Sequence, residues 1–192
     1  MPLSDDFTTD RMGTLWAFYD PAPNEAQRID RRNGILHLKA KGSTPSNCSP
    51  LCCIAGDQAY RITIDVDIDA GAEGGLLLFY NRRLYAGLGI NKSGLMMHRY
   101  GLQRPRGALP GQGDPGGATQ SKLSIRLTND RNILTIHTSD DGRISWRKFD
   151  VQMEVSGYHH NVAYDFLSLR PAIYAAGEGT VRFRNFTYEA LP

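Results

Sequence analysis

The chain has 192 residues, of which 41% are hydrophobic and 22% are charged. These values are typical of a single globular domain with one sizeable core, so we expect residues 1–192 to form one domain. The formal charge of +2, without any block of like charge, disfavours nucleic acid and anionic membranes as partners.

No apolar run approaches the roughly 20 residues of a membrane helix, which argues against a membrane protein. The opening residues "MPLSDDF" have neither the basic nor the apolar segment of a signal peptide. The sequence leaves localisation open, because a cytoplasmic protein and a domain excised from a larger exported protein would look the same.

Alternation of apolar and polar residues predicts strands in the first half of the chain. The segment "ILHLKAK" from Ile35 is the first strand, and residues 60–69 carry Ile or Val at every second position. Further strands are expected over 75–81, 84–91 and 95–100, because Gly, Asn and Asp turn signals separate them.

The cysteines at positions 48, 52 and 53 are clustered in "NCSPLCCIAG". A tetrahedral zinc site needs a second Cys or His pair, which this segment lacks. We therefore interpret the cysteines as reduced, structural thiols.

The second half of the chain begins with "RPRGALPGQGDPGGATQ", residues 104–120, a Pro- and Gly-rich segment that predicts a loop. The strand "KLSIRLTND" leads through the turn-forming residues 129–132 into "ILTIHTS", so a hairpin is expected. The turn "DDG" then directs the chain towards "ISWRKF", and strands are expected over 171–176 and 180–189.

No window of helical length shows a 3.6-residue apolar stripe. Ten or more closely spaced strands indicate an all-β fold, specifically a two-sheet antiparallel sandwich of jelly-roll type. A single open sheet could not cover both of its faces.

The segment "LYAGLGI" is the most informative for function. Its residues at 84, 86, 88 and 90 are apolar and are assigned to the core, which leaves Tyr85, Gly87 and Gly89 on the opposite face. A tyrosine beside two glycines predicts a shallow trough with an aromatic wall, which suits a sugar ring. The alternative is that the aromatic residues are packing residues and that the glycines allow twist or close backbone approach.

The stretch "EVSGYHHNVAYDFLSLRPAIYAAGEG" contains adjacent histidines at 159 and 160. Adjacent residues of a strand point to opposite faces, and helical metal ligands are spaced at i and i+4, so a two-His metal site is not expected. The chain also lacks a Gly-x-Ser-x-Gly elbow, a Cys/His motif and an identifiable carboxylate pair. A free-standing hydrolase with unidentified acids is kept only as an alternative.

The segments "SPLCCIAGDQAYRITIDVDI", "AGAEGGLLLFYNRRLYAGLGI", "HRYG" and "KFDVQMEVSGYHHNVAYDFLSLRPAIYAAGEGTVRFRNFTY" together resemble a known family. They look like the C-terminal concanavalin A-like domain of glycoside hydrolase family 43 β-xylosidases and related arabinofuranosidases. The resemblance runs from Asp5 to Tyr188 and implies a concanavalin A-like sandwich. Some such domains are classed as xylan-binding modules of carbohydrate-binding family 91.

In that family the hydrolytic carboxylates belong to a separate five-bladed propeller. The resemblance therefore implies a non-catalytic accessory domain that binds xylan or xylo-oligosaccharides. The alternative is a structural domain that packs on the propeller and completes its pocket with a loop. The candidate carbohydrate-binding residues are Tyr80, Asn81, Tyr85, His98, Tyr100, Trp146, Tyr158, His159, His160 and Asn161.

Several jelly-roll sugar binders hold a structural calcium ion through carboxylates and backbone carbonyls. Asp6 and Asp165 are the candidate ligands here, with Asp5 next to Asp6 as a further carboxylate. An Asp-rich loop of defined spacing is missing, so solvated surface acids are the competing interpretation. No other cofactor is expected.

Overall fold

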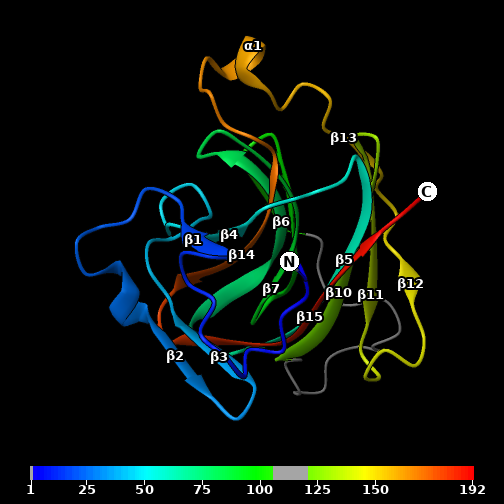
Figure 1. Ribbon diagram of the computed structural model, residues 1–192. Coiled ribbons are helices and arrows are strands. Elements are labelled where there is room, and N and C mark those ends of the chain that lie inside the picture. Colours follow the sequence, from blue (N-terminus) through cyan, green and yellow to red (C-terminus); the bar gives the residue numbers. More distant parts are fainter. Residues whose placement is uncertain (1, 106–120) are drawn as a thin grey trace.

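Two antiparallel β-sheets pack face to face in the computed structural model, which describes residues 2–105 and 121–192 (Figure 1). The seven-stranded sheet contains, in spatial order, β1 (Trp16–Phe18), β4 (Leu51–Cys53), β14 (Arg170–Gly177), β6 (Ala72–Asn81), β7 (Leu84–Asn91), β8 (Gly94–Arg99) and β9 (Leu102–Pro105).

The eight-stranded sheet contains β12 (Arg147–Lys148), β11 (Ile133–Ser139), β10 (Lys122–Asp130), β5 (Ala59–Ile68), β15 (Thr180–Ala190), β3 (Ile35–Lys39) and β2 (Ile29–Arg32). The remaining strand, β13 (Met153–Glu154), pairs with β11 off this path. A 3-10 helix, η1 (Glu25–Arg28), and a short helix, α1 (His160–Ala163), complete the named elements. The predicted all-β, two-sheet, concanavalin A-like class is confirmed.

The strands with clear alternation lie where the sequence predicts them. The β10–β11 hairpin is confirmed, with Asp130 opposite Ile133. Its two turn residues, Arg131 and Asn132, have φ of 45° and 76°, the left-handed conformations that match the twist of a two-residue hairpin. Alternation does not predict β1, β2, β4, β9 and β13, because strands of two to four residues are too short to show it.

The predicted loop over 104–120 is wrong at its first two residues. Arg104 and Pro105 belong to β9 and pair with Met97 and Met96 of β8. A proline is compatible with this position because β9 ends the described order of its sheet, where one row of backbone groups needs no ladder partner. Positions 106–120 lie outside the described residues.

The main core lies between the two sheets. On β5, Ile62, Ile64, Val66 and Ile68 are buried and face it, as the alternation predicts. Trp16, Phe7 and Phe186 close one side of this core, with ring centroids 4.9 Å apart between Trp16 and Phe186. The core therefore joins the N-terminal segment to the last strand.

Every residue of the strand β6 is buried, so neither face of this strand is open to solvent. Its other face belongs to a second cluster, formed by Cys48, Cys52, Leu77, Phe79, Tyr85, Ala172, Tyr174 and Ala176. This cluster, which we call the outer cluster, lies on the face of the seven-stranded sheet turned away from the main core. The chain itself therefore covers both faces of this sheet.

Candidate functional site

The face of β7 that carries Tyr85 is closed by the chain itself. Tyr85 is 1% exposed and stacks on Phe79 with ring centroids 5.6 Å apart. The hydroxyl of Tyr174 occupies the space over Gly89, only 1.9 Å from where a Cβ of that residue would lie. The structure thus differs from the predicted open trough, because Tyr174 of β14, the next strand but one, reaches across the glycines of β6 and fills it.

A buried polar network runs through the same face. The Tyr174 hydroxyl donates to Glu73 Oε1 at 2.8 Å and lies 2.8 Å from His98 Nε2. Burial, followed by the nearby Glu73 carboxylate, raises the pKa of Tyr174 well above its ordinary value. Tyr174 therefore stays protonated and links His98 to Glu73 as a structural bridge.

The outer cluster is held in place by an ionic clamp, Glu25, Arg28 and Lys41. Both cations contact the Glu25 carboxylate, with Lys41 Nζ at 2.6 Å from Oε2. Arg28 also donates from Nη1 to the carbonyl oxygen of Cys48 at 2.8 Å. The clamp thereby ties η1 to the segment that lies over Tyr85 and its neighbours.

We expect Glu25→Gln to lower the free energy of unfolding at pH 7 by about 1.5–3 kcal/mol, the range for hydrogen bonds to charged groups. Burial alone would raise the pKa of Glu25, but hydrogen bonds from Lys41, Arg28 and the Ala22 amide lower it overall. The carboxylate therefore stabilises the fold above its ordinary pKa of about 4.5, and this contribution is lost as the pH falls through the lower folded value.

Urea unfolding of the wild type and of Glu25→Gln at pH 7 and pH 3 checks this expectation. The difference between their free energies of unfolding should be smaller at pH 3. A difference that stays constant, or grows, would contradict the role of the clamp.

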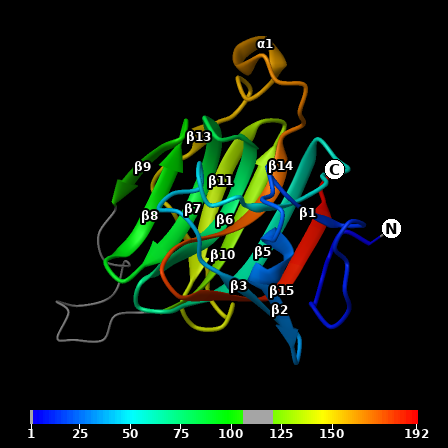
Figure 2. The ribbon, with the colours of Figure 1, turned by 90° about the vertical axis from the view of Figure 1, so that its left-hand side faces the viewer.

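Residues 158–167 form a projection that contains α1, which we call the α1 lobe. It extends beyond the ends of the strands in two perpendicular views (Figures 1 and 2). His159 caps α1, its Nδ1 accepting a hydrogen bond from the Asn161 amide at 3.2 Å. Tyr164 ends the helix with a left-handed φ of 60°.

The base of the α1 lobe is anchored to the seven-stranded sheet. Tyr80 donates from its hydroxyl to the Asp165 carbonyl oxygen, and Asn81 donates from Nδ2 to the Asp165 carboxylate. On the other side, the Tyr158 hydroxyl accepts from the Tyr100 amide at 2.9 Å. These contacts fix one end of the lobe at the end of β6 and the other at the turn after β8.

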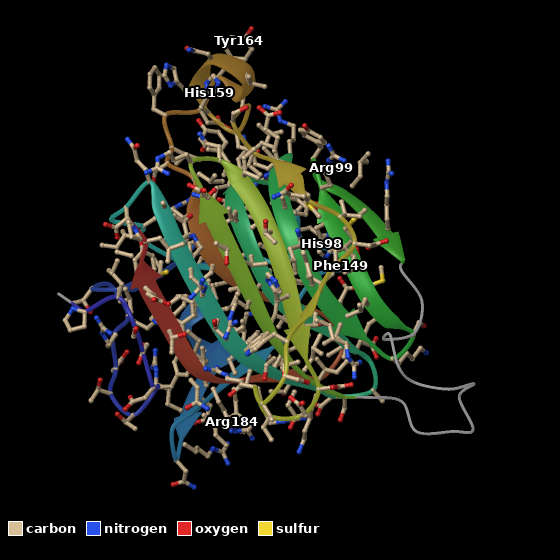
Figure 3. The ribbon with its side chains drawn as sticks, turned by 90° about the vertical axis from the view of Figure 1, so that its right-hand side faces the viewer. His98, Arg99, Phe149, His159, Tyr164 and Arg184 are labelled. Carbon is tan, nitrogen blue, oxygen red and sulfur yellow. The ribbon has the colours of Figure 1, made fainter. Side chains whose placement is uncertain are left out.

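The tip of the α1 lobe is apolar and exposed. Tyr164 is 85% exposed and Phe166 is 94% exposed, with the Phe166 ring stacked on His160 at a centroid distance of 5.7 Å. Val162 adds a further exposed side chain. Figure 3 shows Tyr164 at the outer end of the lobe.

The predicted site residues thus divide into separate groups. Tyr80, Asn81, Tyr85, His98 and Tyr158 are buried, and they support the sheet or the lobe. The second group is accessible to solvent and lies in or beside the α1 lobe: Tyr100, His159, His160 and Asn161. Whether any of them contacts sugar stays a prediction.

Trp146 lies apart from these groups, at the outer face of the eight-stranded sheet. Its ring is half-buried and packs under the Arg126 guanidinium, whose central carbon is 3.7 Å from the ring centroid. The structure therefore does not bring Trp146 together with the lobe.

Sequence reasoning missed the tip residues Tyr164 and Phe166. The signal that could have found them is the run "VAYDFL", which places large apolar residues in a segment with neither strand nor helix periodicity. Such residues have no core face to occupy, so exposure on a lobe is the expected consequence.

The calcium candidates do not converge. Asp6 accepts hydrogen bonds from Thr8 in the N-terminal segment. Asp165 accepts a hydrogen bond from Asn81 at the base of the α1 lobe. Across residues 2–105 and 121–192, there is no group of three or more His, Cys, Asp or Glu side chains placed to share a metal ion.

The three cysteines are free and buried, as predicted for structural thiols. Burial raises the pKa of Cys48 and of Cys52 to about 12, which keeps both protonated and unreactive. Within the described part of the chain, no helix is long and apolar enough to cross a membrane.

The fold and the lobe together define a two-sheet sandwich with an anchored, aromatic-tipped projection. A family model described as the beta xylosidase C-terminal concanavalin A-like domain matches residues 4–189, and the chain belongs to this family. No curated protein sequence matches the chain.

Solved structures share the fold at low sequence identity. The GH43 BlXynB protein from Bacillus licheniformis has a TM-score of 0.78 at 17% identity, covering 98% of this chain and 39% of that one. Xylan beta-1,4-xylosidase from Bacillus halodurans C-125 has a TM-score of 0.78 at 14% identity, with the same two coverages. The GH43B protein of a Bacteroides ovatus xyloglucan locus has a TM-score of 0.76 at 15% identity, covering 100% and 40%. The chain spans about two fifths of the length of these proteins.

Proposed function

We propose that this chain is a non-catalytic accessory domain that packs on a family 43 catalytic domain through the α1 lobe. The tip of the lobe then lies at the partner's substrate pocket and supplies part of its wall. The observation that carries this proposal is the pairing of a firmly anchored base with two almost fully exposed aromatic rings, Tyr164 and Phe166.

Exposed aromatic rings on a fixed support favour association. A large apolar side chain exposed to water has an unfavourable hydration free energy, and its burial against a partner is favourable by about 1.5–3 kcal/mol. Because Tyr80 and Asn81 hold the lobe at Asp165, less conformational entropy is lost when the tip docks. The lobe is thus built as a preorganised contact.

The arrangement of acids supports a non-catalytic role. Glycoside hydrolysis commonly uses two carboxylates that flank the scissile bond. The α1 lobe carries one carboxylate, Asp165, and that group accepts a hydrogen bond from Asn81. Under this proposal the reacting carboxylates come from the partner.

Xylan binding by the isolated chain is expected to be weak under this proposal. The Tyr85 face is filled by Phe79, His98 and Tyr174, so it presents no open stacking surface. Any sugar contact would fall to the rings at the lobe tip. Such a small contact corresponds to an affinity in about the millimolar range.

The direct test uses a family 43 catalytic domain from the organism that encodes this chain, prepared without a C-terminal sandwich. Titration with the chain should give saturable one-to-one binding and raise kcat/KM for an aryl xyloside by about tenfold or more, equivalent to about 1.4 kcal/mol. Calorimetry with xylohexaose runs in parallel. Saturable xylohexaose binding by the chain alone, without any effect on the catalytic domain, would replace the proposal by an independent xylan-binding role.

A further inference from the structure

A row of basic side chains crosses the outer face of the eight-stranded sheet, the face turned towards the viewer in Figure 3. Arg126 of β10 is directly opposite His137 of β11, which is directly opposite Lys148 of β12. Arg61 of β5 lies diagonally across from Arg126, since it pairs with Thr128. We call these four residues the basic row.

The basic row gathers cationic side chains on one face, with Arg61 diagonally across from Arg126 and Lys148 on the far side of His137. Diagonal neighbours on one face lie within reach of long side chains, so like charges there repel each other. Burial, followed by repulsion from Arg61 and Arg143, lowers the pKa of Arg126, and burial followed by repulsion from Arg126 and Lys148 lowers the pKa of His137. The sheet surface is therefore locally electropositive.

Several side-chain nitrogen atoms in the basic row also lack a partner among the described residues. The Nε atoms of Arg61 and Arg126 and the Nδ1 atom of His137 are buried without a hydrogen bond to any described residue. Most buried polar atoms are paired in folded proteins, so unpaired ones point to a group that the protein chain does not provide.

Two of the cations in this region, Arg61 of the row and the nearby Arg143, have acidic partners. Glu189 contacts Arg61 at 3.1 Å on one side, and Asp65 contacts Arg143 at 2.7 Å on the other. The positive region without an acidic contact among the described residues is thus confined to Arg126, His137 and Lys148. A region of this size fits one anionic group and not the continuous phosphate track of a nucleic acid.

The surroundings of Arg126 favour a sugar as the carrier of that group. The Trp146 ring packs against the guanidinium at 3.7 Å and is itself partly exposed. Two half-buried threonines, at positions 128 and 135, flank the row on the same face. Guanidinium groups match carboxylates in a planar, two-bond geometry, while an indole and hydroxyls suit the body of a sugar ring.

We propose that the basic row and Trp146 bind the carboxylate of a uronic acid unit carried by a polysaccharide. This site is on the sheet face, whereas the α1 lobe projects past the strand ends (Figure 3). The proposal consequently goes beyond the docking function and is tested independently of it.

Calorimetry of the 192-residue chain with two xylo-oligosaccharides of equal backbone length tests the proposal. One carries a single glucuronic acid branch and the other is unbranched. The branched sugar should bind about tenfold more tightly at low ionic strength. Arg126→Gln should remove this difference, and Lys148→Gln should reduce it about threefold. Lys92→Gln, which deletes an exposed charge on the turn between β7 and β8, should leave it unchanged.

Circular dichroism and thermal unfolding verify that each variant is folded, and the exposed Lys148 provides a variant with little risk to the fold. Equal affinity for the two oligosaccharides would overturn the proposal, as would an equal loss in Lys92→Gln. Competition by sodium sulfate or by a single-stranded DNA oligonucleotide that equals or exceeds competition by sodium glucuronate would also overturn it. Stronger competition by glucuronate would support it.

Discussion

Replacement of Trp16 by alanine is expected to lower the free energy of unfolding by about 3–5 kcal/mol, the usual cost of removing a large buried aromatic side chain. Trp16 is 1% exposed and contacts both Phe7 and Phe186. Its indole nitrogen also donates to the buried Asp5 carboxylate at 2.8 Å. The substitution therefore leaves a cavity and an unsatisfied acceptor at once.

Urea unfolding followed by intrinsic fluorescence and circular dichroism measures this loss. Trp146→Ala provides a matched control, since it removes the same side chain from a half-buried site where the main contact is with Arg126. Its cost should be about 0.5–1 kcal/mol, the value of an exposed cation–π contact. Equal losses in the two variants would show that the N-terminal segment is not part of the core.

The second large effect concerns the tip of the α1 lobe. Tyr164→Ala combined with Phe166→Ala should reduce the stimulation of a family 43 catalytic domain by about tenfold or more in kcat/KM. Both rings are almost fully exposed, so the free energy of unfolding should change by no more than about 0.5 kcal/mol. Function would thus be lost without loss of the fold.

Ile144→Ala is the control for this variant. Ile144 is 87% exposed but follows the turn after β11, away from the α1 lobe. It should keep full stimulation of the catalytic domain. Equal stimulation by the lobe variant and the control would contradict a role for the lobe tip.

The strands could be predicted because each carries its own signal. In β5 and β10, apolar side chains recur at every second position, and this period directly records which face meets the core. The hairpin turn is marked locally by Asn132, a residue type that tolerates the left-handed conformation it adopts. These features depend on neighbours in sequence, so one sequence suffices.

The closure of the Tyr85 face could not be predicted in the same way. It depends on Tyr174, which lies 89 positions later in the chain, and on Glu25 and Arg28 of η1, which hold the covering segment. Contacts over such separations leave no periodic trace in the sequence. The pattern at Tyr85, Gly87 and Gly89 correctly separates the two faces of β7, but it does not record what covers the second face.

The histidine segment was likewise predictable only in part. The sequence marks residues 158–161 as a feature between strands, and the structure places them at the start of the α1 lobe. Yet Tyr158 is buried at the base, while the exposed rings belong to Tyr164 and Phe166. Which side chain reaches the tip depends on where α1 ends, and that point is set by the left-handed conformation of Tyr164.

The most direct test of the account is hydrogen exchange of the chain, measured by mass spectrometry with and without the family 43 catalytic domain. We predict that amides of residues 158–167 exchange more slowly in the complex, while amides on the outer face of the eight-stranded sheet exchange at unchanged rates. Slower exchange on that sheet, with no change in the α1 lobe, would contradict docking through the lobe.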